Sequence, residues 1–491
     1  MNADSSAANA AIATAANTAT AGFAFDNTYA RELEGAYVPW QAAQAPQPAL
    51  VKFNRALADE LGLAVEVLDS PLGAALFSGN ELPEGATPIA QAYAGHQFGG
   101  FSPQLGDGRA LLLGEVIDRK GRRRDIAFKG SGRTPFSRGG DGKAALGPML
   151  REVLISEFLA AVGIPTTRAL AVVATGETIW RERALPGAVL ARVAASHLRV
   201  GTFQFFWARG DQAQVKALAD YAIARHYPTL VGTDQPYLGF LDAVIERQAR
   251  LIAQWMGVGF IHGVMNTDNM AISGESIDFG PCAFMEGYAP GTVFSSIDRQ
   301  GRYAYANQPA ILGWNLARLA ETLVPLLDPD PDRAVDLANA RLEGIAGRYR
   351  TEWLAVMRRK LGLVGEDAGD AALADDLLAA MGGADWTLTF LRLGDEASLR
   401  PLFDDFTAMR AWLPRWRARA GDGATQRLAA ANPAVIPRNH RVEEALTAAT
   451  DGDMAPFQAL LSAVQQPFVP QEAFLPPAPT GFGAYVTYCG T

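Results

Sequence analysis

The sequence changes its pattern near Leu185, and this change limits the folds that the chain can adopt. Before this point glycine is dense between residues 95 and 147, and apolar runs such as RALLLGEV (109–116) and DIAFK (125–129) have the length of strands. After it, apolar residues recur at helical spacing, most clearly over residues 241–256. We therefore predict an α+β fold with a strand-rich N-terminal lobe, a larger helical C-terminal lobe and a ligand site between the two lobes.

Two elements next to the glycine-dense region are predicted from their boundaries. Residues 148–162 form a predicted helix, because a proline suits the first turn and Gly163 follows the last apolar position. Residues 168–180 are predicted to form two strands that are joined by a turn at Gly176.

The predicted domain organisation has four parts. Residues 1–30 contain no Lys or Arg, so they match neither a signal peptide nor a mitochondrial transit peptide, and we expect a flexible leader and a cytoplasmic location. The strand-rich lobe is placed at residues 31–185 and the helical lobe at residues 186–465. Residues 466–491 are expected to form a proline-rich extended tail that contains Cys489.

Composition excludes several classes of protein. Of the 491 residues, 49% are hydrophobic and 19% are charged, which is enough apolar material for large cores and excludes a wholly disordered chain. No apolar run reaches the roughly 18 uninterrupted residues of a membrane span, so no membrane partner is expected. The net charge of −9 argues against a nucleic-acid partner. Two cysteines are too few for a disulfide framework or a Cys-rich zinc site.

The most specific chemical signal is the segment IHGVMNTDNMAISGESIDFGP at residues 261–281. His262 begins a loop, Asn269 follows seven residues later, and an Asp-Phe-Gly triplet begins at Asp278 after a predicted short hairpin turned at residues 273–275. Kinase segments have His-Arg-Asp-x-x-x-x-Asn followed by Asp-Phe-Gly, in which the Asn and the second Asp hold metal ions on the nucleotide phosphates. Both metal-ligand positions are therefore filled here.

The position of the usual kinase base is occupied by Val264, which cannot accept a proton. Asp268, immediately before Asn269, offers an acid at a displaced position, which suggests chemistry at a different phosphate. The simpler interpretation is that Asp268 caps the loop. His262 is expected to be a structural imidazole that packs inside the loop.

Two glycine-containing segments are candidates for nucleotide contacts. GDGR at residues 106–109 precedes a predicted strand, where backbone amides could approach a phosphate without interference from a Cβ atom. A lone Gly-x-Gly is weak evidence, because most such matches are turns. GGDGK at residues 139–143 is predicted to be a second flexible loop that could close over a nucleotide.

Several charged residues outside the loop are further candidates. Lys129 ends an Ala-x-Lys run like that of the third kinase strand, and it can pair with phosphates if a carboxylate from the next helix holds it. Glu152 is a suitable partner and Glu157 is its competitor, although both could be solvated acids. Arg192 and Arg199 carry forks that suit phosphate oxygens, with surface ion pairs as the simpler interpretation.

Three blocks of the chain resemble the selenoprotein O family: YAGHQFGGFSPQLGDGRALLLGE, FKGSGRTPFSRGGDGKAALGPMLREVLISE and HGVMNTDNMAISGESIDFGP. The resemblance covers the chain from about residue 27 to the C-terminus, and blocks of this length are highly specific. It implies a protein-kinase-like two-lobed fold with N- and C-terminal extensions. It also implies a protein adenylyltransferase, which binds ATP inverted relative to kinases and transfers AMP to Ser, Thr or Tyr hydroxyls of partner proteins.

The resemblance also assigns roles to residues. Asp268 is the expected catalytic proton acceptor, and Asn269 and Asp278 are the expected ligands of Mg²⁺, with Mn²⁺ as the other candidate ion. The expected nucleotide contacts are Gly106, Gly108, Arg109, Lys129, Asp141, Gly142, Arg192, Arg199 and Asp278.

Two further roles account for the charges of the site. Glu152 is expected to pair with Lys129, and Arg192 and Arg199 to hold the buried γ-phosphate. The missing base at Val264 then follows from the different position of the reacting phosphate.

The C-terminus departs from the pattern of some family members, which end in a selenocysteine motif. Here the residue is an ordinary cysteine, Cys489, so selenium chemistry is not expected. We hypothesise a reversible Cys282–Cys489 disulfide that ties the tail to the segment after the Asp-Phe-Gly triplet. Two unconnected thiols are the alternative.

Three other functions stay open at this point. The same site could use UTP with Mn²⁺ to transfer UMP, since nothing in the sequence selects adenine over uracil. An ordinary phosphotransferase is disfavoured by Val264. A non-catalytic pseudokinase scaffold is disfavoured by the complete set of Lys129, Asn269 and Asp278, because a scaffold needs no metal ligands.

Overall fold

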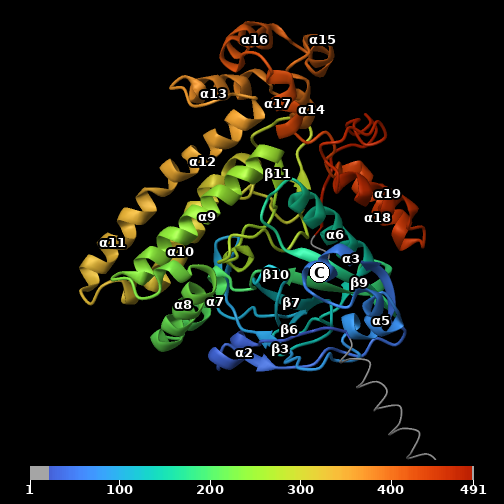
Figure 1. The fold of residues 1–491 in the computed structure, drawn as a ribbon, viewed down its shortest axis with the longest axis vertical. Helices are drawn as coiled ribbons and strands as arrows, with labels where there is room; N and C mark the ends of the chain where they lie inside the picture. The colour runs from blue at the N-terminus through green and yellow to red at the C-terminus, as the bar shows by residue number, and fades with distance from the viewer. Residues whose placement is uncertain (1–20, 489–491) are drawn as a thin grey trace, which may run out of the picture.

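The computed structural model describes residues 21–488, in which most strands precede most helices along the chain (Figure 1). The strands are β1 (Tyr37–Pro39), β2 (Ala49–Phe53), β3 (Ile89–Gln91), β4 (Gly95–Gln97), β5 (Gly100–Ser102), β6 (Ala110–Ile117), β7 (Arg123–Lys129), β8 (Ala144–Ala145), β9 (Arg168–Trp180), β10 (Ala184–Ala194), β11 (Phe260–Ile261) and β12 (Ala283–Phe284).

The first helices accompany the sheet, and the later ones form the rest of the molecule. They are α2 (Thr28–Glu32), α3 (Arg55–Glu60), α4 (Val65–Leu68), α5 (Pro71–Ser78), α6 (Leu146–Ala161), α7 (Val200–Trp207), α8 (Gln212–His226), α9 (Pro236–Val258), α10 (Gln308–Leu327), α11 (Pro331–Glu343), α12 (Ile345–Lys360), α13 (Asp370–Ala380), α14 (Trp386–Arg392), α15 (Glu396–Leu399), α16 (Thr407–Ala420), α17 (Ala424–Ala431), α18 (Asn439–Thr450) and α19 (Ala455–Val464).

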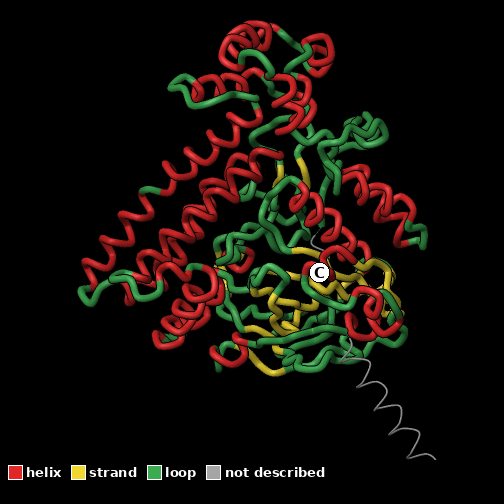
Figure 2. The backbone as a smooth tube through the Cα atoms, in the orientation of Figure 1, coloured by secondary structure: helices red, strands yellow, loops and turns green. Residues whose placement is uncertain are grey.

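An antiparallel sheet of eight strands dominates the N-terminal part, and Figure 2 shows its strands gathered at one end of the molecule. The strand order is β1-β3-β6-β7-β10-β9-β2, and β8 pairs with β10 outside this path. The strands predicted at residues 109–116 and 125–129 are confirmed as β6 and β7, which pair with Leu112 opposite Ala127. The predicted α+β class is therefore confirmed.

Both faces of this sheet are covered, because alternate side chains of a strand point to opposite sides. On β10, Ala188 and Leu190 belong to the core that includes α6 and the helical part of the chain. Val189 and Ala191 belong to a second core, which includes α5. The sheet is therefore packed on one face against the core that includes α6 and on the other face against the core that includes α5.

The helices predicted at residues 148–162 and 241–256 are confirmed as α6 and α9. The helix α9 begins with Pro236 in its first turn and ends at Gly259, which has φ +70° and turns the chain into β11. Helices α10 and α12 contact α9 along its length. This packing fixes the start of the loop that follows β11.

Two predictions about strands were wrong. Residues 168–180 form the single strand β9 rather than two strands, and Gly176 with φ +78° lies at an irregularity of its pairing with β10. The strand β10 continues to Ala194, beyond the point near Leu185 where helical pattern was expected, and the next helix begins at Val200. Because β10 is buried on both faces, its apolar residues do not alternate with polar ones, and periodicity does not reveal it.

The hairpin expected at residues 273–275 was also wrong, although a turn exists there. The N–H of Gly274 donates to the carbonyl oxygen of Ala271 over 3.1 Å. The two arms pair with other segments, because Ala271 bridges to Arg199 and Ser276 bridges to Thr166. Long-range partners thus replaced the local pairing that the turn residues suggested.

The segment after α19 contains turns but no helix and no strand longer than a single bridged residue up to residue 488. Thr487 bridges to Ser295, and its hydroxyl donates to the carbonyl oxygen of Pro281 over 2.7 Å. Cys282 is buried. Cys489 lies outside the described residues, so the Cys282–Cys489 disulfide stays a prediction.

One segment of the described chain, Tyr305–Leu327, has the length and apolar composition of a membrane-spanning helix. Its helix α10 packs against α9 and α11, and Leu312, Leu316 and Leu319 are fully buried. The interior helix of a globular protein has the same properties, so this segment is weak evidence for a membrane span.

Candidate active site

A cavity of about 450 Å³ lies where the sheet meets the loop that follows β11. All the residues that the sequence singled out for nucleotide, metal or proton-transfer roles line it, so one site contains them. Their proximity is observed, and their individual roles remain predictions. These residues are Gly106, Gly108, Arg109, Lys129, Asp141, Gly142, Arg192, Arg199, Asp268, Asn269 and Asp278.

Three cations converge on the carboxylate of Asp278. Its Oδ1 accepts hydrogen bonds from Lys129 Nζ and from Arg192 Nη1, both over 2.7 Å, and its Oδ2 accepts one from Arg199 Nη1 over 3.0 Å. Burial by itself would raise the pKa of Asp278, but the cations, Lys129 foremost, hold it well below its usual value. Asp278 is therefore a carboxylate at neutral pH.

The sheet brings two of these cations together. Lys129 ends β7, and Arg192 lies on the adjacent strand β10, where it pairs with Ala127 two residues before the lysine. Residues two apart on a strand point to the same face, so Lys129 and Arg192 share a face of the sheet. The predicted kinase-like Ala-x-Lys run thus ends at the cavity.

The two candidate partners of Lys129, Glu152 and Glu157, form different ion pairs in the structure. Glu152 on α6 forms an ion pair with Lys129 and lies 3.8 Å from Arg192 Nη1. Glu157 instead pairs with Arg168, with its Oε1 2.7 Å from the Arg168 Nε. Both acids are buried rather than solvated. The expected pairing of Glu152 with Lys129 is observed, and Glu157 belongs to a different contact.

Arg192 and Arg199 are not surface ion pairs, which was their simpler interpretation. Both are buried, and the Nε atom of each has no hydrogen-bond partner. The cavity lining as a whole has more basic than acidic side chains, namely Arg109, Lys129, Arg138, Lys143, Arg181, Arg192 and Arg199 against Asp141, Asp268 and Asp278. The wall of the cavity therefore has an excess of positive charge, which suits a polyphosphate.

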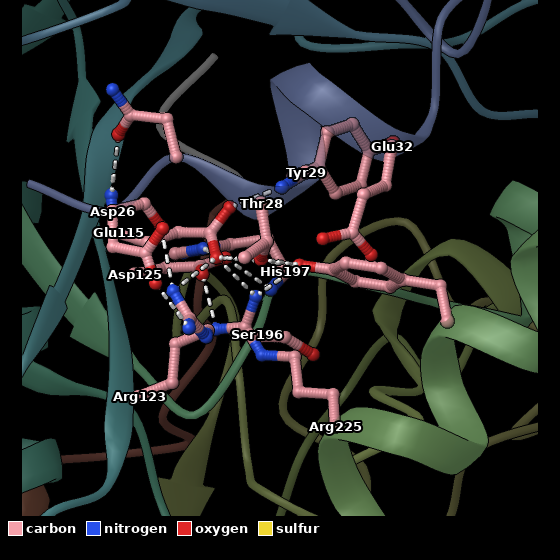
Figure 3. A network of polar contacts seen from close by, with 12 residues as sticks. Asp26, Thr28, Tyr29, Glu32, Glu115, Arg123, Asp125, Ser196, His197 and Arg225 are labelled. Atoms are coloured by element: carbon pink, nitrogen blue, oxygen red, sulfur yellow. Dashed lines mark hydrogen bonds and ion pairs between the residues drawn. The ribbon is translucent and has the colours of Figure 1, made fainter.

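A buried polar network holds the segment between β10 and α7, which follows Arg192 on β10 and ends at Arg199 (Figure 3). The Asp125 carboxylate accepts hydrogen bonds from the backbone N–H and the Nδ1 of His197, over 2.8 and 2.9 Å. Arg225 from α8 pairs with Asp125 and, over 3.2 Å, with Glu115. Glu275 accepts the backbone N–H of Ala195 over 2.8 Å. The backbone that positions Arg192 and Arg199 is thus fixed by ion pairs at some distance from the cavity.

Asp268 and Asn269 lie in a short 3₁₀ turn, Thr267–Asn269. Asp268 is buried, and its Oδ1 has no hydrogen-bond partner. Burial raises the pKa of Asp268 to about 6, which is in the range of an effective general base near neutral pH. The other oxygen, Oδ2, accepts a hydrogen bond from Gln97 Nε2 over 3.5 Å.

The loop that contains Asp268 is also fixed by hydrogen bonds between its side chains and backbone atoms of the same segment. The Asn269 side chain donates from Nδ2 to the carbonyl oxygen of Val264 over 3.0 Å, so its Oδ1 is the end that stays available. His262 is fully buried, accepts the N–H of Val264 at Nδ1 and donates from Nε2 to the carbonyl oxygen of Ile277. Burial also lowers the pKa of His262. It is a structural imidazole, as expected.

The glycines of both predicted loops serve close packing. Gly106 has φ +67°, and a Cβ atom there would lie 2.3 Å from the ring of Phe136. Gly142 has φ +69°, and its Cβ would lie 2.1 Å from a backbone carbonyl oxygen. The N–H of Gly106 donates to the carbonyl oxygen of Tyr93, and that of Gly108 to the carbonyl oxygen of Gly106. These amides are therefore occupied within the protein, unlike the open amides expected from the sequence.

Two predicted residues lie nearer the rim. Asp141 is exposed, and its carboxylate accepts hydrogen bonds from both terminal nitrogens of Arg181, over 2.8 and 3.0 Å. This contact with Arg181 lowers the pKa of Asp141. Arg109 stands directly before β6 and lines the same cavity.

Sequence reasoning missed some residues of the site. Tyr93 lines the cavity, and the guanidinium of Arg199 lies 4.6 Å above the centre of its ring, a cation–π contact. Gln97 also lines the cavity, with its Nε2 3.5 Å from Asp268 Oδ2. Both belong to the block YAGHQFGGFSPQLGDGRALLLGE, in which only the glycine-containing segment GDGR was considered as a candidate.

Backbone strain is concentrated at this cavity. Within residues 21–488, the non-glycine residues with positive φ are Phe98 at +52°, Arg138 at +50° and Asp278 at +65°. All three line the cavity. Such conformations cost about 1–3 kcal/mol each and persist at functional sites, where the surrounding structure enforces them.

The donor atoms present suit a divalent cation that shares its coordination with a substrate. Among the described residues, no group of three or more His, Cys, Asp or Glu side chains could hold a metal ion. Asn269 and Asp278 contribute amide and carboxylate oxygens, and Mg²⁺ is typically held by one or two such ligands plus phosphates and water. Asp278 Oδ2 accepts a single hydrogen bond, from Arg199, and so retains a lone pair for a cation.

Comparison with known proteins agrees with the resemblance seen in the sequence. The family model described as protein adenylyltransferase SelO matches residues 21–465. The protein nucleotidyltransferase YdiU of Cereibacter sphaeroides (strain ATCC 17029 / ATH 2.4.9) is 65% identical over 480 residues, which is 96% of this chain and 100% of the relative. The protein of the same name from Rhizobium etli (strain CIAT 652) is 58% identical over 494 residues, which is 97% of this chain and 99% of the relative. The chain therefore belongs to the SelO family and is a protein nucleotidyltransferase.

Proposed function

We propose that this enzyme transfers AMP from ATP to Ser, Thr or Tyr hydroxyls of other proteins, with ATP bound in the opposite direction to that in kinases. The observation that carries the proposal is the convergence of Lys129, Arg192 and Arg199 on Asp278 at one wall of the cavity. A kinase exposes its γ-phosphate to the acceptor. The mainly basic lining and the buried position of Arg192 and Arg199 instead favour a terminal phosphate that is held inside, which leaves the α-phosphate nearer the opening.

In this proposal, different side chains bind the phosphates, position the cations and leave the γ-phosphate without an acceptor. Arg192 and Arg199 bind the γ-phosphate through their guanidinium forks, and Tyr93 keeps Arg199 in place by stacking beneath it. Glu152 holds Lys129 against the phosphates. Val264 presents an apolar side chain where a kinase has its base, so the γ-phosphate has no activated acceptor beside it.

Asp268 is the proton acceptor in this proposal. The acceptor hydroxyl gives its proton to Asp268 while its oxygen bonds to the α-phosphorus. The bond between the α-phosphorus and the bridging oxygen to the β-phosphate breaks, and pyrophosphate leaves with that electron pair. Asp268 lines the cavity, and its buried Oδ1 has no hydrogen-bond partner among the described residues.

Asn269 and Asp278 would hold Mg²⁺ or Mn²⁺, which when bound offsets the negative charge of the phosphates. The side chains of Lys129, Arg192 and Arg199, which converge on Asp278, supply the rest of this compensation.

A kinase-like two-lobed architecture is part of the proposal. It is supported by the ion pair between Lys129 on a sheet strand and Glu152 on the following helix, which matches the strand lysine and helix glutamate of kinases. The limits first expected for the lobes, residues 31–185 and 186–465, divide β10, so we propose that the strand-rich lobe includes the whole of this strand, Ala184–Ala194. The cytoplasm is the compartment that we propose, on the sequence grounds given above.

Paired isotope labelling tests the proposed function. The protein is incubated with Mg²⁺ and a protein extract, with ATP labelled at the α- or the γ-phosphate. We expect protein labelled from the α-position alone, and loss of this label in Asp278→Ala and Asp268→Asn. Glu157→Gln is the matched control, because that carboxylate is buried on the same helix but pairs away from the cavity. Label from the γ-position alone would mean that ATP is not inverted.

A second pair of reactions uses UTP labelled at the α-phosphate, with Mg²⁺ or Mn²⁺. Stronger protein labelling from UTP than from ATP would replace AMP by UMP in the proposal. A protein that labels nothing from either nucleotide, yet binds ATP, would have the properties of a scaffold.

A further inference from the structure

A small hairpin covers the loop that contains Asp268. Strands β4 and β5 pair with each other, separately from the large sheet. The backbone N–H of His96 donates to Thr267 Oγ1 over 2.7 Å, and that of Phe98 donates to Asn266 Oδ1 over 3.1 Å. The hairpin is therefore fastened by its main chain to the residues just before Asp268.

The approach between hairpin and loop is very close at Gly95. A Cβ atom on this residue would lie 2.4 Å from Asp268 Oδ1. Only a residue without a side chain allows the hairpin to reach this position. The side-chain amide nitrogen of Gln97, two residues further along β4, lies 3.5 Å from the other oxygen of Asp268. A residue bound along this hairpin would therefore be near the carboxylate.

The turn of the hairpin has an unusual residue. Phe98 and Gly99 have φ of +52° and +87°, the left-handed pair that two-residue hairpin turns require. Asn or Asp normally precedes the glycine in such turns, and a phenylalanine is strained there. The Phe98 side chain is 37% exposed and lines the cavity. A strained, exposed aromatic residue beside a cavity indicates a role for the side chain itself.

A second exposed apolar residue lines the same cavity. Ile297 is 49% exposed and comes from the segment after the Asp-Phe-Gly triplet, far from the hairpin in sequence. Phe98 itself contacts Tyr303 from that segment, with ring centres 5.1 Å apart. Apolar side chains from two segments thus lie at the opening of a cavity whose inner wall is cationic.

We propose that the β4–β5 hairpin and Ile297 together form the acceptor subsite, in which Phe98 and Ile297 bind apolar side chains that neighbour the hydroxyl residue of the acceptor polypeptide. This inference rests on the proposed function. The occupant is a polypeptide for two reasons. Phe98 and Ile297 line the cavity of a protein nucleotidyltransferase, whose acceptor is a protein. Their apolar side chains would also contact apolar side chains of that acceptor and not the nucleotide phosphates. The hydroxyl then reaches Asp268 while its neighbour stays on the hairpin.

The reaction at this subsite is the transfer already described. The acceptor oxygen bonds to the α-phosphorus, its proton passes to Asp268, and pyrophosphate leaves. Phe98 and Ile297 do not contact the reacting atoms in this proposal, and they act by raising the local concentration of the acceptor.

The test replaces Phe98 by asparagine, which suits a positive φ and should not disturb the turn. Phe98→Asn should lower kcat/KM for casein, an unfolded acceptor protein, by at least about tenfold, mainly through KM. Binding of a fluorescent ATP analogue with Mg²⁺ should stay within about twofold of the unmodified protein. Phe468→Asn is the matched control, because Phe468 is 39% exposed and lies in the segment after α19, and it should change neither quantity.

A pair of peptides tests the chemistry of the subsite. Each carries one tyrosine, flanked by leucines in one peptide and by aspartates in the other. The leucine peptide should be labelled at least about tenfold faster, and Phe98→Asn and Ile297→Ser should each remove most of this preference.

The results can contradict the subsite without contradicting the proposed function. Transfer by Phe98→Asn within twofold of the unmodified protein, or equal labelling of the two peptides, would overturn the subsite alone. Loss of ATP binding in Phe98→Asn would show that the hairpin supports the nucleotide site instead. Absence of α-label in any acceptor with the unmodified protein would contradict the proposed function itself.

Discussion

Lys129 Nζ lies 2.7 Å from Asp278 Oδ1, although 149 residues separate them in the sequence. The contact joins the end of β7 to the segment after β11, so the cavity exists only when the sheet and the loop are both in place. It also explains the low pKa of Asp278, because burial, which would raise it, is outweighed by Lys129 and two arginines. A carboxylate that stays ionised among three cations is prepared for a divalent ion and a polyphosphate together.

Asp278→Asn should separate nucleotide binding from metal dependence. The change removes one negative charge from among Lys129, Arg192 and Arg199, so ATP should bind at least as tightly in EDTA as it does to the unmodified protein. The stimulation of binding by Mg²⁺ should disappear, and transfer should fall at least about 100-fold. Titration calorimetry with and without Mg²⁺ measures this, and preserved stimulation by Mg²⁺ would exclude Asp278 as a ligand.

Glu152→Gln and Glu157→Gln should have different effects, although both residues are buried on α6. Glu152→Gln frees Lys129, so we expect nucleotide affinity and transfer to fall by about tenfold to 100-fold. Glu157→Gln leaves Arg168 without its partner and should destabilise the fold by about 1–3 kcal/mol with nearly unchanged transfer per folded molecule. Transfer rates and urea unfolding of both variants decide this. Equal kinetic effects would refute the assignment of Glu152.

Gly106→Ala should reduce nucleotide affinity more than its backbone conformation alone would cause. Gly106 and Gly121 both have positive φ, +67° and +74°, but a Cβ would lie 2.3 Å from Phe136 at Gly106 and has free space at Gly121. Gly121→Ala should therefore cost only about 1 kcal/mol of stability. Gly106→Ala should cost more and displace Phe136, which lines the cavity. Comparable stability and ATP affinity of the two variants would contradict this packing role.

His197 should make the protein less stable in mild acid. Its burial, together with Arg192 and Arg199, lowers its pKa to about 4, and the contact with Asp125 only partly opposes this. The unfolded histidine, with a pKa near 6.5, binds a proton more readily than the folded one. Stability is therefore lost as the pH falls from about 6.5 towards 4, by about 2 kcal/mol between pH 7 and pH 5.

The variant His197→Asn tests this linkage, since asparagine can still donate a hydrogen bond to Asp125. Urea unfolding at pH 7 and pH 5 should show a smaller pH dependence in the variant, by about the same 2 kcal/mol. An identical pH dependence in both proteins would mean that other groups account for the acid sensitivity.

Local patterns predicted much of the fold. The helices α6 and α9 and the strands β6 and β7 were predicted within a few residues, because their apolar spacing and the residues that end them are local properties. Strand β10 was missed because it is buried on both faces, and burial on both faces depends on α5 and α6, which are distant in sequence. The turn at Gly274 was predicted, but its arms pair with Thr166 and Arg199, which only the assembled chain provides.

The candidate site, like the fold, could be predicted from the sequence only in part. The Asn269 and Asp278 positions and the valine at the base position were visible in one short motif, and the family resemblance supplied the candidate roles of distant residues. The residue pattern alone left Glu152 and Glu157 as competing partners of Lys129, because both are acids on the same predicted helix. The family resemblance favoured Glu152, and the structure shows that ion pair. The Phe98 turn was missed as well, since strain appears only when φ is known.

The types of side chain, their order and the local elements that carry them are properties of this sequence alone, because helical and extended spacing depend on neighbouring residues. Folding determined which charges meet. Burial of Arg192, Arg199 and Asp268 removed the water that would otherwise screen them, and the same groups on an exposed surface would have ordinary pKa values and weak ion pairs. The excess of positive charge beside a partnerless carboxylate oxygen is therefore a property of the tertiary structure.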